Sequence, residues 1–254
     1  MADALLQVAG LTKRFGGVVA SDNIALDVRP GELHAIIGPN GAGKTTLIGQ
    51  LTGEIAPDAG RIAFDGADIT ALPVYERSAL GLARSFQITS LFPDFTALDN
   101  VALAVQAHAG HSFRFWNDAR REDALRAPAR AALDRVGLGA RADALVVSMS
   151  HGEHRQLELA MALATSPRLL LLDEPMAGLG PEESARMVEM LRALKRDLTI
   201  LLVEHDMEAV FALADRITVL VYGRVIASGD PAAIRANAEV RQAYLGEQEA
   251  VTHV

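Results

Sequence analysis

The sequence contains no cysteine, so a disulfide scaffold and any zinc or redox chemistry that depends on thiols are excluded. It also lacks an apolar run of the roughly 20 residues that a membrane-spanning helix needs, and the longest runs, such as Leu198–Val203, are far shorter. The first residues, MADALLQVAGLTKRF, show no cationic segment followed by an apolar segment and a cleavage site. No secretion signal is therefore expected, and any role at a membrane is expected to depend on a partner protein.

Basic residues are fewer than acidic residues. The 24 Lys and Arg residues are outnumbered by 32 Asp and Glu residues, which gives a net charge of −8. Nucleic acid is not expected as the main ligand, because binding to its backbone relies on Lys and Arg side chains that neutralise phosphates. Apolar residues make up 50% of the 254 residues, which is enough for a sizeable core.

Short apolar runs alternate with amphipathic stretches rich in Ala and Leu, a pattern typical of an α/β domain with a largely parallel sheet. Three runs predict buried strands: Leu33–Ile37, Leu169–Leu172 and Thr199–Val203. The dipeptides Tyr222–Gly223 and Asp65–Gly66 follow further apolar runs and predict hairpin turns. The N-terminal third is expected to be rich in β structure. Residues 97–164 are expected to be almost entirely helical and to form a block inserted into the α/β domain.

The segment GPNGAGKTT, residues 38–46, follows one of these strands and precedes a helical pattern. It matches the phosphate-binding loop G-x-x-x-x-G-K-[ST] in the strand–loop–helix context that the motif requires. Its glycines let backbone N–H groups turn toward a polyphosphate at the positive end of the helix. Lys44 is expected to reach the β- and γ-phosphates, and the Thr45 hydroxyl is expected to bind Mg²⁺. The residues of this loop expected to bind the nucleotide are Gly38, Pro39, Asn40, Gly41, Ala42, Gly43, Lys44, Thr45 and Thr46.

The apolar run LLLLDEP, residues 169–175, ends in two acids. A strand that ends in an acid opposite a phosphate-binding loop is what a Mg²⁺ site requires, so Asp173 is expected to hold the metal ion or one of its water ligands. Glu174 beside it is the candidate general base that polarises the attacking water. Without the phosphate-binding loop, the same run would as readily predict a buried strand that ends in a solvated turn.

A long helical block separates Lys44 from Asp173, which is unlike small GTPases and nucleotide kinases, and no N-K-x-D guanine-reading motif is present. The segments GPNGAGKTT, LLLLDEP and LLVEHD, in this order around the helical insert, strongly resemble the ATP-binding subunits of ABC transporters, from about Leu6 to Gly246. The resemblance implies an α/β P-loop NTPase fold with a RecA-like core, an N-terminal antiparallel β region and an inserted helical subdomain. It also implies a single ABC ATPase domain over residues 1–254. Residues 1–87 and 165–254 would form its catalytic core, and about 88–164 its helical subdomain.

The resemblance assigns roles to further residues. Phe15, in LTKRFGG, corresponds to the aromatic residue that stacks on adenine; the alternative is a core Phe at a strand end. Gln87, in ARSFQITSLFP, corresponds to the glutamine that binds Mg²⁺ and senses the attacking water at the hinge to the helical subdomain. His205, in LLVEHDM, corresponds to the switch histidine that contacts the γ-phosphate. In EPMAGLGPEE, which resembles the loop that touches the second ATPase, Gly180 stands where an acid is usual.

The segment MSHGE, residues 149–153, occupies the place of the family signature LSGGQ but keeps only Ser150 and Gly152 of that motif. The resemblance implies that these two residues bind the γ-phosphate held by the opposite subunit. A hydroxyl group and free N–H groups at a helix N-terminus favour such an anion. Ser150-x-x-Glu153 also matches a capping box, in which Glu153 accepts a hydrogen bond from the Ser150 N–H.

Histidine pairs offer a third interpretation of this segment. His151 and His154 are three residues apart on an expected helix, as are His108 and His111, and this spacing can chelate a metal ion. The sequence provides neither a cysteine nor an obvious third ligand for either pair. Zinc is therefore the least favoured of the three interpretations.

Within the family, four stretches resemble the ATPases of branched-chain and other hydrophobic amino-acid importers, and most of all the longer of the two ATPases in such importers. These stretches are RSFQITSLFPDFTALDNV, SHGE with RQLELAMAL, EPMAGLGPEE and AYLGEQE. The resemblance implies hydrolysis of ATP with Mg²⁺ and a head-to-tail dimer with a second ABC ATPase, identical or homologous. It also implies two transmembrane permease subunits, a periplasmic solute-binding protein and a peripheral position at the cytoplasmic face of the inner membrane.

Other members of the family remain alternatives. Importers of urea or short amides are closely similar, and exporters of lipid or lipopolysaccharide share compact ATPases. A soluble ABC protein that acts in translation or DNA repair is less favoured, because such proteins usually carry two cassettes or a long coiled coil. The sequence shows a single cassette, no long coiled coil and an acidic charge balance.

Overall fold

The computed structural model describes residues 4–85, 91–108 and 122–243, and Gln87 and His111 lie outside these ranges. A four-stranded antiparallel sheet has the order β2-β1-β4-β5. Its strands are β1 (Leu6–Phe15), β2 (Val18–Val28), β4 (Ala59–Phe64) and β5 (Ala67–Asp68). The second sheet is six-stranded, with the order β10-β9-β3-β8-β7-β6. Its strands are β3 (Leu33–Ile37), β6 (Leu82–Arg84), β7 (Leu169–Asp173), β8 (Thr199–Val203), β9 (Arg216–Val221) and β10 (Arg224–Gly229).

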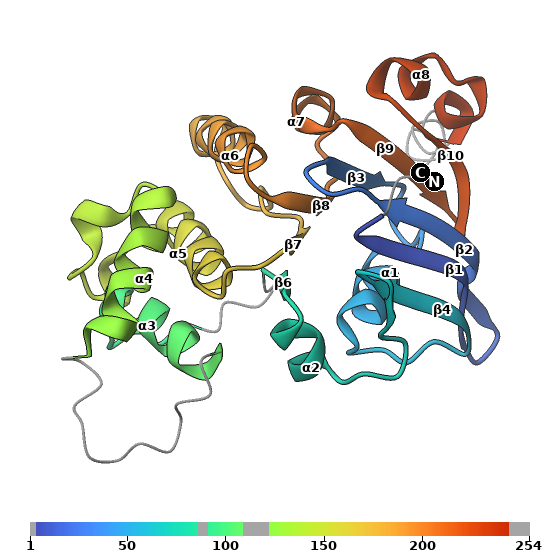
Figure 1. Cartoon of the computed structure of the whole chain (residues 1–254). Helices are drawn as coiled ribbons and strands as arrows, with labels where there is room; N and C mark the ends of the chain where they lie inside the picture. Colours follow the sequence, from blue (N-terminus) through green and yellow to red (C-terminus); the bar gives the residue numbers. More distant parts are fainter. Residues whose placement is uncertain (1–3, 86–90, 109–121, 244–254) are drawn as a thin grey trace.

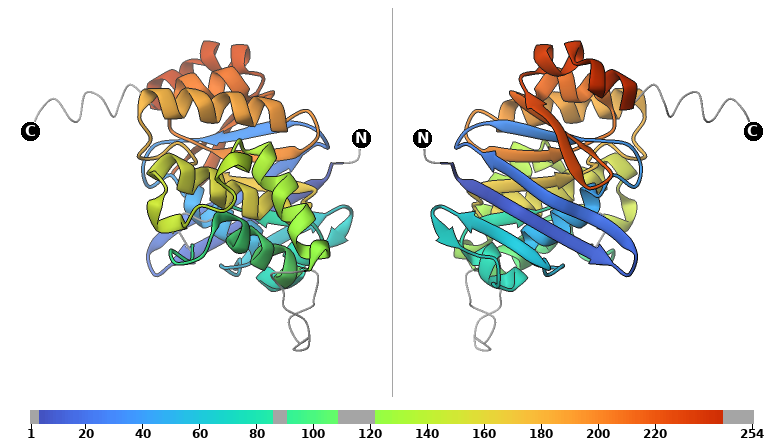
Figure 2. Two further views of the ribbon diagram at one scale, coloured as in Figure 1. Left: turned by 90° about the vertical axis from the view of Figure 1, so that its left-hand side faces the viewer. Right: turned by 90° about the vertical axis from the view of Figure 1, so that its right-hand side faces the viewer.

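Three of the helices pack together as one block. The helical block consists of α3 (Ala97–His108), α4 (Asp123–Arg135) and α5 (His151–Ala164), which contact one another. The others are α1 (Lys44–Thr52), α2 (Val74–Ala79), α6 (Pro181–Leu194), α7 (Met207–Leu213) and α8 (Pro231–Ala236). In the two views of Figure 2, the helical block (green to yellow) covers one side of the molecule and the N-terminal sheet (blue) covers the opposite side. Within the described residues, no helix combines the length and apolar composition that a bilayer crossing requires.

The predicted strands and turns are confirmed. Strands β3 and β8 have the predicted bounds, and β7 extends one residue further, to Asp173. Both predicted turns join antiparallel neighbours, with Tyr222 between β9 and β10 and Asp65 between β4 and β5. These two residues have φ angles of 46° and 50° and are each followed by a glycine with positive φ. This is the backbone that a tight hairpin turn needs.

The expectation of an almost continuous helical segment is wrong for residues 136–150. This stretch forms turns and two short 3-10 helices, Gly139–Arg141 and Val146–Ser148. Gly137, with a φ of 78°, turns the chain directly after α4. The segment then runs beside the residues that precede α3, where Thr96 and Leu145 form an isolated antiparallel bridge.

The central strands are buried on both faces, which explains their continuous apolar sequences. Leu33, Ala35 and Ile37 belong to one apolar cluster, together with α6, α7 and the helical block. Ile36 belongs to a second cluster, formed with α1 and the four-stranded sheet. Adjacent residues of one strand thus face different layers, and the six-stranded sheet lies between them (Figure 1).

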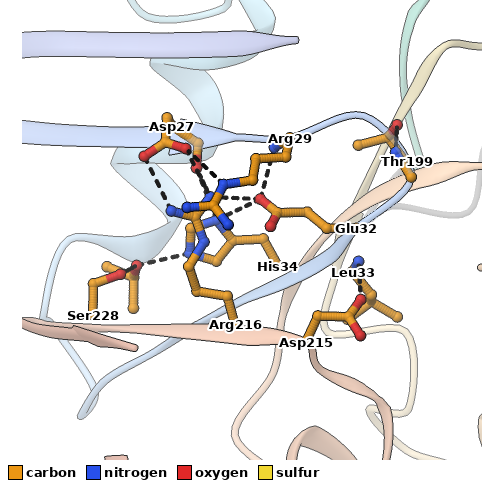
Figure 3. Close-up of polar contacts among 11 residues, drawn as sticks. Asp27, Arg29, Glu32, Leu33, His34, Thr199, Asp215, Arg216 and Ser228 are labelled. Carbon is orange, nitrogen blue, oxygen red and sulfur yellow. Dashed lines mark hydrogen bonds and ion pairs between the residues drawn. The ribbon is translucent and has the colours of Figure 1, made fainter. Parts of the chain in front are cut away.

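A buried polar network lies at the start of β3, the end of the strand remote from the loop 38–46 (Figure 3). Arg216 donates hydrogen bonds to Asp27 and Glu32, at 3.0 and 2.5 Å. The fully buried ring of His34 lies with Nδ1 3.0 Å from the Asp27 carbonyl oxygen and Nε2 2.7 Å from the Thr218 hydroxyl. Glu32 also lies 3.6 Å from Nδ1, but its carboxylate already accepts from Arg216.

This network predicts a loss of stability in mild acid. The pKa of His34 is lowered from 6.5 to about 4, mainly by burial and also by the nearby Arg216 charge, against the opposing effect of the Asp27 carbonyl. Below about pH 6.5 the unfolded chain therefore binds a proton that the folded chain excludes. The free energy of unfolding should fall by about 3 kcal/mol between about pH 6.5 and pH 4 because of this residue alone. Urea unfolding across this pH range measures the effect.

A His34→Gln variant provides the control. Its stability deficit relative to the unmodified chain should shrink as the pH falls, because Gln has no proton to exclude. If the free energies of unfolding of the two proteins changed with pH in parallel, the acid sensitivity could not be assigned to His34.

Candidate nucleotide site

The loop 38–46 joins β3 to α1, and its backbone geometry depends on glycine. Gly41 and Gly43 have φ angles of 76° and 100°. A Cβ atom on Gly43 would lie 2.1 Å from the Ala20 carbonyl oxygen, and one on Gly38 equally close to that of Leu220. Helix α1 has no side-chain cap, so the N–H groups of its first turn are left for a ligand, as an anion-binding loop requires.

Lys44 folds back over the loop. Its Nζ donates to the carbonyl oxygens of Gly38 and Pro39, at 2.6 and 3.0 Å. The loop is also tied to the β9–β10 turn, where the Gly223 N–H donates to the Ala42 carbonyl oxygen at 2.9 Å. The cation is thus positioned above the concave backbone where a polyphosphate would lie.

Strand order brings the acids to this loop. Strands β3, β8 and β7 are parallel neighbours, so their carboxyl ends lie at one edge of the sheet. Asp173, at the end of β7, is only 3% exposed, and its Oδ2 accepts a hydrogen bond from Arg84 at 2.9 Å. Burial raises the pKa of Asp173, while the charges of Arg84 and Lys44 oppose this effect. The influence of Lys44 shows that the loop and the acid share one electrostatic environment.

Glu174 has an unusual backbone for its residue type. Its φ of 50° is left-handed, and its N–H donates to the Val203 carbonyl oxygen at 2.8 Å. Its Oε1 lies 3.9 Å from His205 Nδ1, and both side chains are partly exposed. A left-handed non-glycine residue costs roughly 1–3 kcal/mol and is typical of functional sites that the surrounding structure holds in place. The structure therefore brings Asp173, Glu174 and His205 together beside the loop.

Glu204 is a residue of this site that the sequence did not single out. It is completely buried, and its carboxylate accepts three backbone N–H groups, from Met176 at 3.0 Å, His205 at 2.9 Å and Asp206 at 3.3 Å. Glu204 thereby connects the segment after β7 to the turn after β8. The only signal in the sequence was an acid directly after the apolar run of β8.

Arg84 was also missed. It pairs with Glu54 at 2.6 Å as well as with Asp173, so it bridges the end of α1 and the end of β7. Nothing around Arg84 in the sequence indicated this role, because its two partners are distant along the chain.

Phe15 lies at the end of β1 and is 49% exposed, which rules out the alternative of a core phenylalanine. Its ring centroid lies 5.5 Å from Lys13 Nζ. The residue is thus exposed enough for its ring to stack on a planar ligand.

The predicted capping box at the start of α5 is confirmed. The Glu153 N–H donates to Ser150 Oγ at 3.2 Å, and the Ser150 N–H donates to Glu153 Oε2 at 2.8 Å. The second carboxylate oxygen, Oε1, accepts from Arg141 Nε at 2.9 Å. His154 Nε2 lies 2.9 Å from the Val146 carbonyl oxygen, which gives this ring a structural contact. The described residues contain no group of three or more His, Cys, Asp or Glu side chains placed to hold a metal ion together.

Ser150 and Gly152 face α6 rather than their own phosphate-binding loop. They line a groove of about 260 Å³ with residues of α6, and no lining residue comes from the loop 38–46. A Cβ atom on Gly152 would lie 2.5 Å from Glu183 Oε1, at the flexible end of that side chain, so Gly152 and Glu183 of α6 lie close together. Gly180 is the N-cap of α6, and its N–H donates to Glu183 at 3.2 Å.

Replacing Glu153 with Ala is expected to cost about 1 kcal/mol or less of stability, the usual value of a helix cap. ATPase activity should be largely retained, because both carboxylate oxygens are engaged in contacts within the chain. Urea unfolding and steady-state hydrolysis measure the two quantities. A collapse of activity in a normally folded variant would place the carboxylate in the nucleotide site instead.

Comparison with known proteins agrees with this geometry. Residues 21–177 match the ABC transporter family, and residues 224–250 match a family described as branched-chain amino acid ATP-binding cassette transporter. The high-affinity branched-chain amino acid transport ATP-binding protein BraF of Pseudomonas aeruginosa is 39% identical over 254 residues, covering 97% of this chain and 100% of that protein. Its counterpart LivG of Escherichia coli is 38% identical over 256 residues, with the same coverage.

A solved structure gives the same result for the fold. The ADP conformation of MJ1267, an ATP-binding cassette of an ABC transporter, superposes with a TM-score of 0.85 at 28% identity, covering 96% of this chain and 99% of that one. The chain is thus an ABC cassette in fold as well as in sequence. This chain belongs to the ABC transporter ATP-binding proteins, a family whose members bind ATP and hydrolyse it to power transport.

Proposed function

We propose that this chain is the ATPase subunit of an importer for branched-chain or other hydrophobic amino acids. The similarity to BraF and LivG over 97% of the chain carries the proposal. The match of residues 224–250 adds support, because this segment lies outside the nucleotide motifs that ABC ATPases have in common.

The arrangement of side chains supports a role for each in hydrolysis. The loop residues Gly38 to Thr46 would hold the phosphates, with Lys44 as the cation, and Phe15 would stack on the adenine. Glu174 would accept a proton from the water that attacks the γ-phosphorus, as the bond to the ADP oxygen breaks. His205, whose ring is 3.9 Å from Glu174, would contact the γ-phosphate.

The same edge of the sheet suits Mg²⁺. Thr45 offers a hydroxyl oxygen and Asp173 a carboxylate beside the phosphate-binding loop, and such hard oxygen ligands are what Mg²⁺ prefers. Bound there, the ion would neutralise phosphate charge. Gln87, which lies outside the described residues, is assigned to the same site by its family position alone. Arg84 would have to share Asp173 with the ion, since it already occupies Oδ2.

The placement of Ser150 and Gly152 favours a two-subunit site. Ser150 is exposed, and no residue of the chain's own phosphate-binding loop lines the groove beside Ser150 and Gly152. Both residues would therefore be available to the nucleotide of a second ABC ATPase, identical or homologous. In this arrangement two ATP molecules would lie between the subunits. Residues 1–87 and 165–254 would act as the catalytic core of each subunit, with about 88–164 as its helical subdomain.

A second groove suits a membrane partner. It has a volume of about 490 Å³, lies between α2, α3 and α5, and is lined mainly by apolar side chains. At its rim Tyr75 is 72% and Val74 42% exposed. Exposed apolar surface of this kind marks interaction sites, and we assign it to a cytoplasmic segment of the transmembrane permeases. The chain would then lie peripherally at the cytoplasmic face of the inner membrane, in an importer that also uses a periplasmic solute-binding protein.

Purification of the tagged chain from native membranes tests the proposal. We expect two permeases to copurify, together with a second ATPase, and we expect deletion of the gene to abolish leucine uptake. Copurified permeases of a urea or lipid transporter, with normal leucine uptake, would overturn the substrate assignment. Copurification with RNA or DNA in a salt-sensitive manner, without any permease, would overturn the transport role.

A further inference from the structure

Glu153, the last residue of the segment MSHGE, places a negative charge in the first turn of α5. Hydrogen bonding from the Ser150 N–H, and the Arg141 guanidinium in addition, hold the pKa of Glu153 below its usual range, so the carboxylate is ionised at neutral pH. Its side chain is 24% exposed, on the same surface as Ser150 and Gly152. A carboxylate at this position would repel an approaching polyphosphate unless another group compensates it.

Arg141 provides that compensation. It follows α4 in the chain, and its Nε donates to Glu153 Oε1 at 2.9 Å while the Ser150 N–H occupies Oε2. Both carboxylate oxygens thus accept hydrogen bonds from within the chain. The guanidinium is 43% exposed, so part of its positive charge faces the same groove.

Among the charged side chains of this groove in the described residues, Arg141 is the one that pairs with Glu153. Helix α6 contributes Glu183 and Arg186 to the groove, and Glu183 is a second carboxylate, close to Gly152. No ion pair joins Arg186 to another residue in the described part of the chain. His154 is near enough to influence Glu153, but its Nε2 is directed to the Val146 carbonyl oxygen.

We propose that Arg141 is a positioning residue for the nucleotide of the opposite subunit. By pairing with Glu153 it neutralises and orients this carboxylate, so that Ser150 and Gly152 can receive the γ-phosphate that the second ATPase holds. The inference rests on the proposed two-subunit site. It explains how an acid can occupy the last position of a signature that must bind an anion.

Removing the charge of Arg141 alone, and then the charges of Arg141 and Glu153 together, tests the proposal directly in the purified transporter complex. Arg141→Gln should raise the KM for ATP about tenfold with a smaller change in kcat, because an uncompensated carboxylate would face the phosphate. The double variant Arg141→Gln/Glu153→Gln should return KM to within about twofold of the original value. High salt should reduce the defect of the single variant.

Two controls separate this role from a structural one. Arg186→Gln removes an equal charge from the same groove and should leave KM nearly unchanged. Binding of ATP to the isolated chain, at its own phosphate-binding loop, should be unaffected by Arg141→Gln. A purely structural role would lower the unfolding temperature of Arg141→Gln, with no rescue of KM by Glu153→Gln. This result, or an equal KM defect in Arg186→Gln, would overturn the inference.

The proposed function fails in a distinguishable way. If the complex shows no ATP hydrolysis, or if Glu174→Gln hydrolyses ATP at the normal rate, the nucleotide site itself is wrongly assigned. If hydrolysis depends on Glu174 while KM is insensitive to Arg141, only the role of Arg141 is refuted.

Discussion

Replacing Glu174 with Gln is expected to lower kcat for ATP hydrolysis by about 10²–10⁴-fold, the usual contribution of a general base. The amide keeps the size of the side chain but cannot take a proton from the attacking water. Affinity for ATP should be unchanged, because Glu174 lies at the end of β7 and outside the loop that holds the phosphates. Steady-state hydrolysis and equilibrium binding of a fluorescent ATP analogue measure the two quantities separately.

Glu208→Gln is the matched control, since Glu208 is an acid in the first turn of α7, close in sequence to His205. It should hydrolyse ATP at nearly the normal rate. Normal hydrolysis by Glu174→Gln would remove this residue from the role of base. Loss of binding together with turnover would indicate instead that its left-handed backbone maintains the shape of the site.

Replacing Lys44 with Ala is expected to weaken ATP binding by roughly 10–100-fold. Hydrogen bonds to a charged partner contribute about 1.5–3 kcal/mol, and the variant loses those between Nζ and the phosphates. Calorimetric titration with ATP gives the affinity directly. Hydrolysis should fall as well, because less enzyme is loaded at a given ATP concentration.

The loop could also lose its shape in this variant, because Lys44 holds the Gly38 and Pro39 carbonyl oxygens. The unfolding temperature of the variant distinguishes general damage from loss of a ligand contact. Lys195→Ala, which breaks an ion pair with Asp215 on another surface, serves as the control and should bind ATP normally. An unaltered affinity in Lys44→Ala would refute the assignment of the phosphate-binding loop.

The local elements of this fold were predictable because each carries its own signal. The strand Leu33–Ile37 is a continuous apolar run, and the glycines after it mark the loop. The capping box was equally local, since Ser150 and Glu153 are only three residues apart. The helix prediction for residues 136–150 was wrong because this local signal is missing there. Short 3-10 helices have no sequence periodicity that distinguishes them from an α-helix.

Long-range contacts were not predictable from one sequence. The order β3-β8-β7 depends on the packing of whole layers, and nothing in the run LLLLD specifies its neighbours. Glu204 and Arg84 were missed for the same reason. Their partners, such as Met176 and Asp173, become neighbours only when the sheet has formed. The candidate site was found through short motifs, and the residues that support those motifs became visible only in three dimensions.

The burial of Glu204 limits how far the segment after β7 and the turn after β8 can move relative to each other. Separating the turn that carries His205 from the segment that begins at Met176 would break the hydrogen bond from the Met176 N–H to the buried Glu204 carboxylate, and leaving such groups unsatisfied costs about 1–3 kcal/mol or more. The proposed sensor of the γ-phosphate and the segment leading toward the proposed subunit boundary are therefore expected to move together. Any hinge that opens and closes the cassette is then expected elsewhere in the chain. Departure of the γ-phosphate would move the His205 turn and the segment that begins at Met176 together, and so would change the proposed subunit boundary directly.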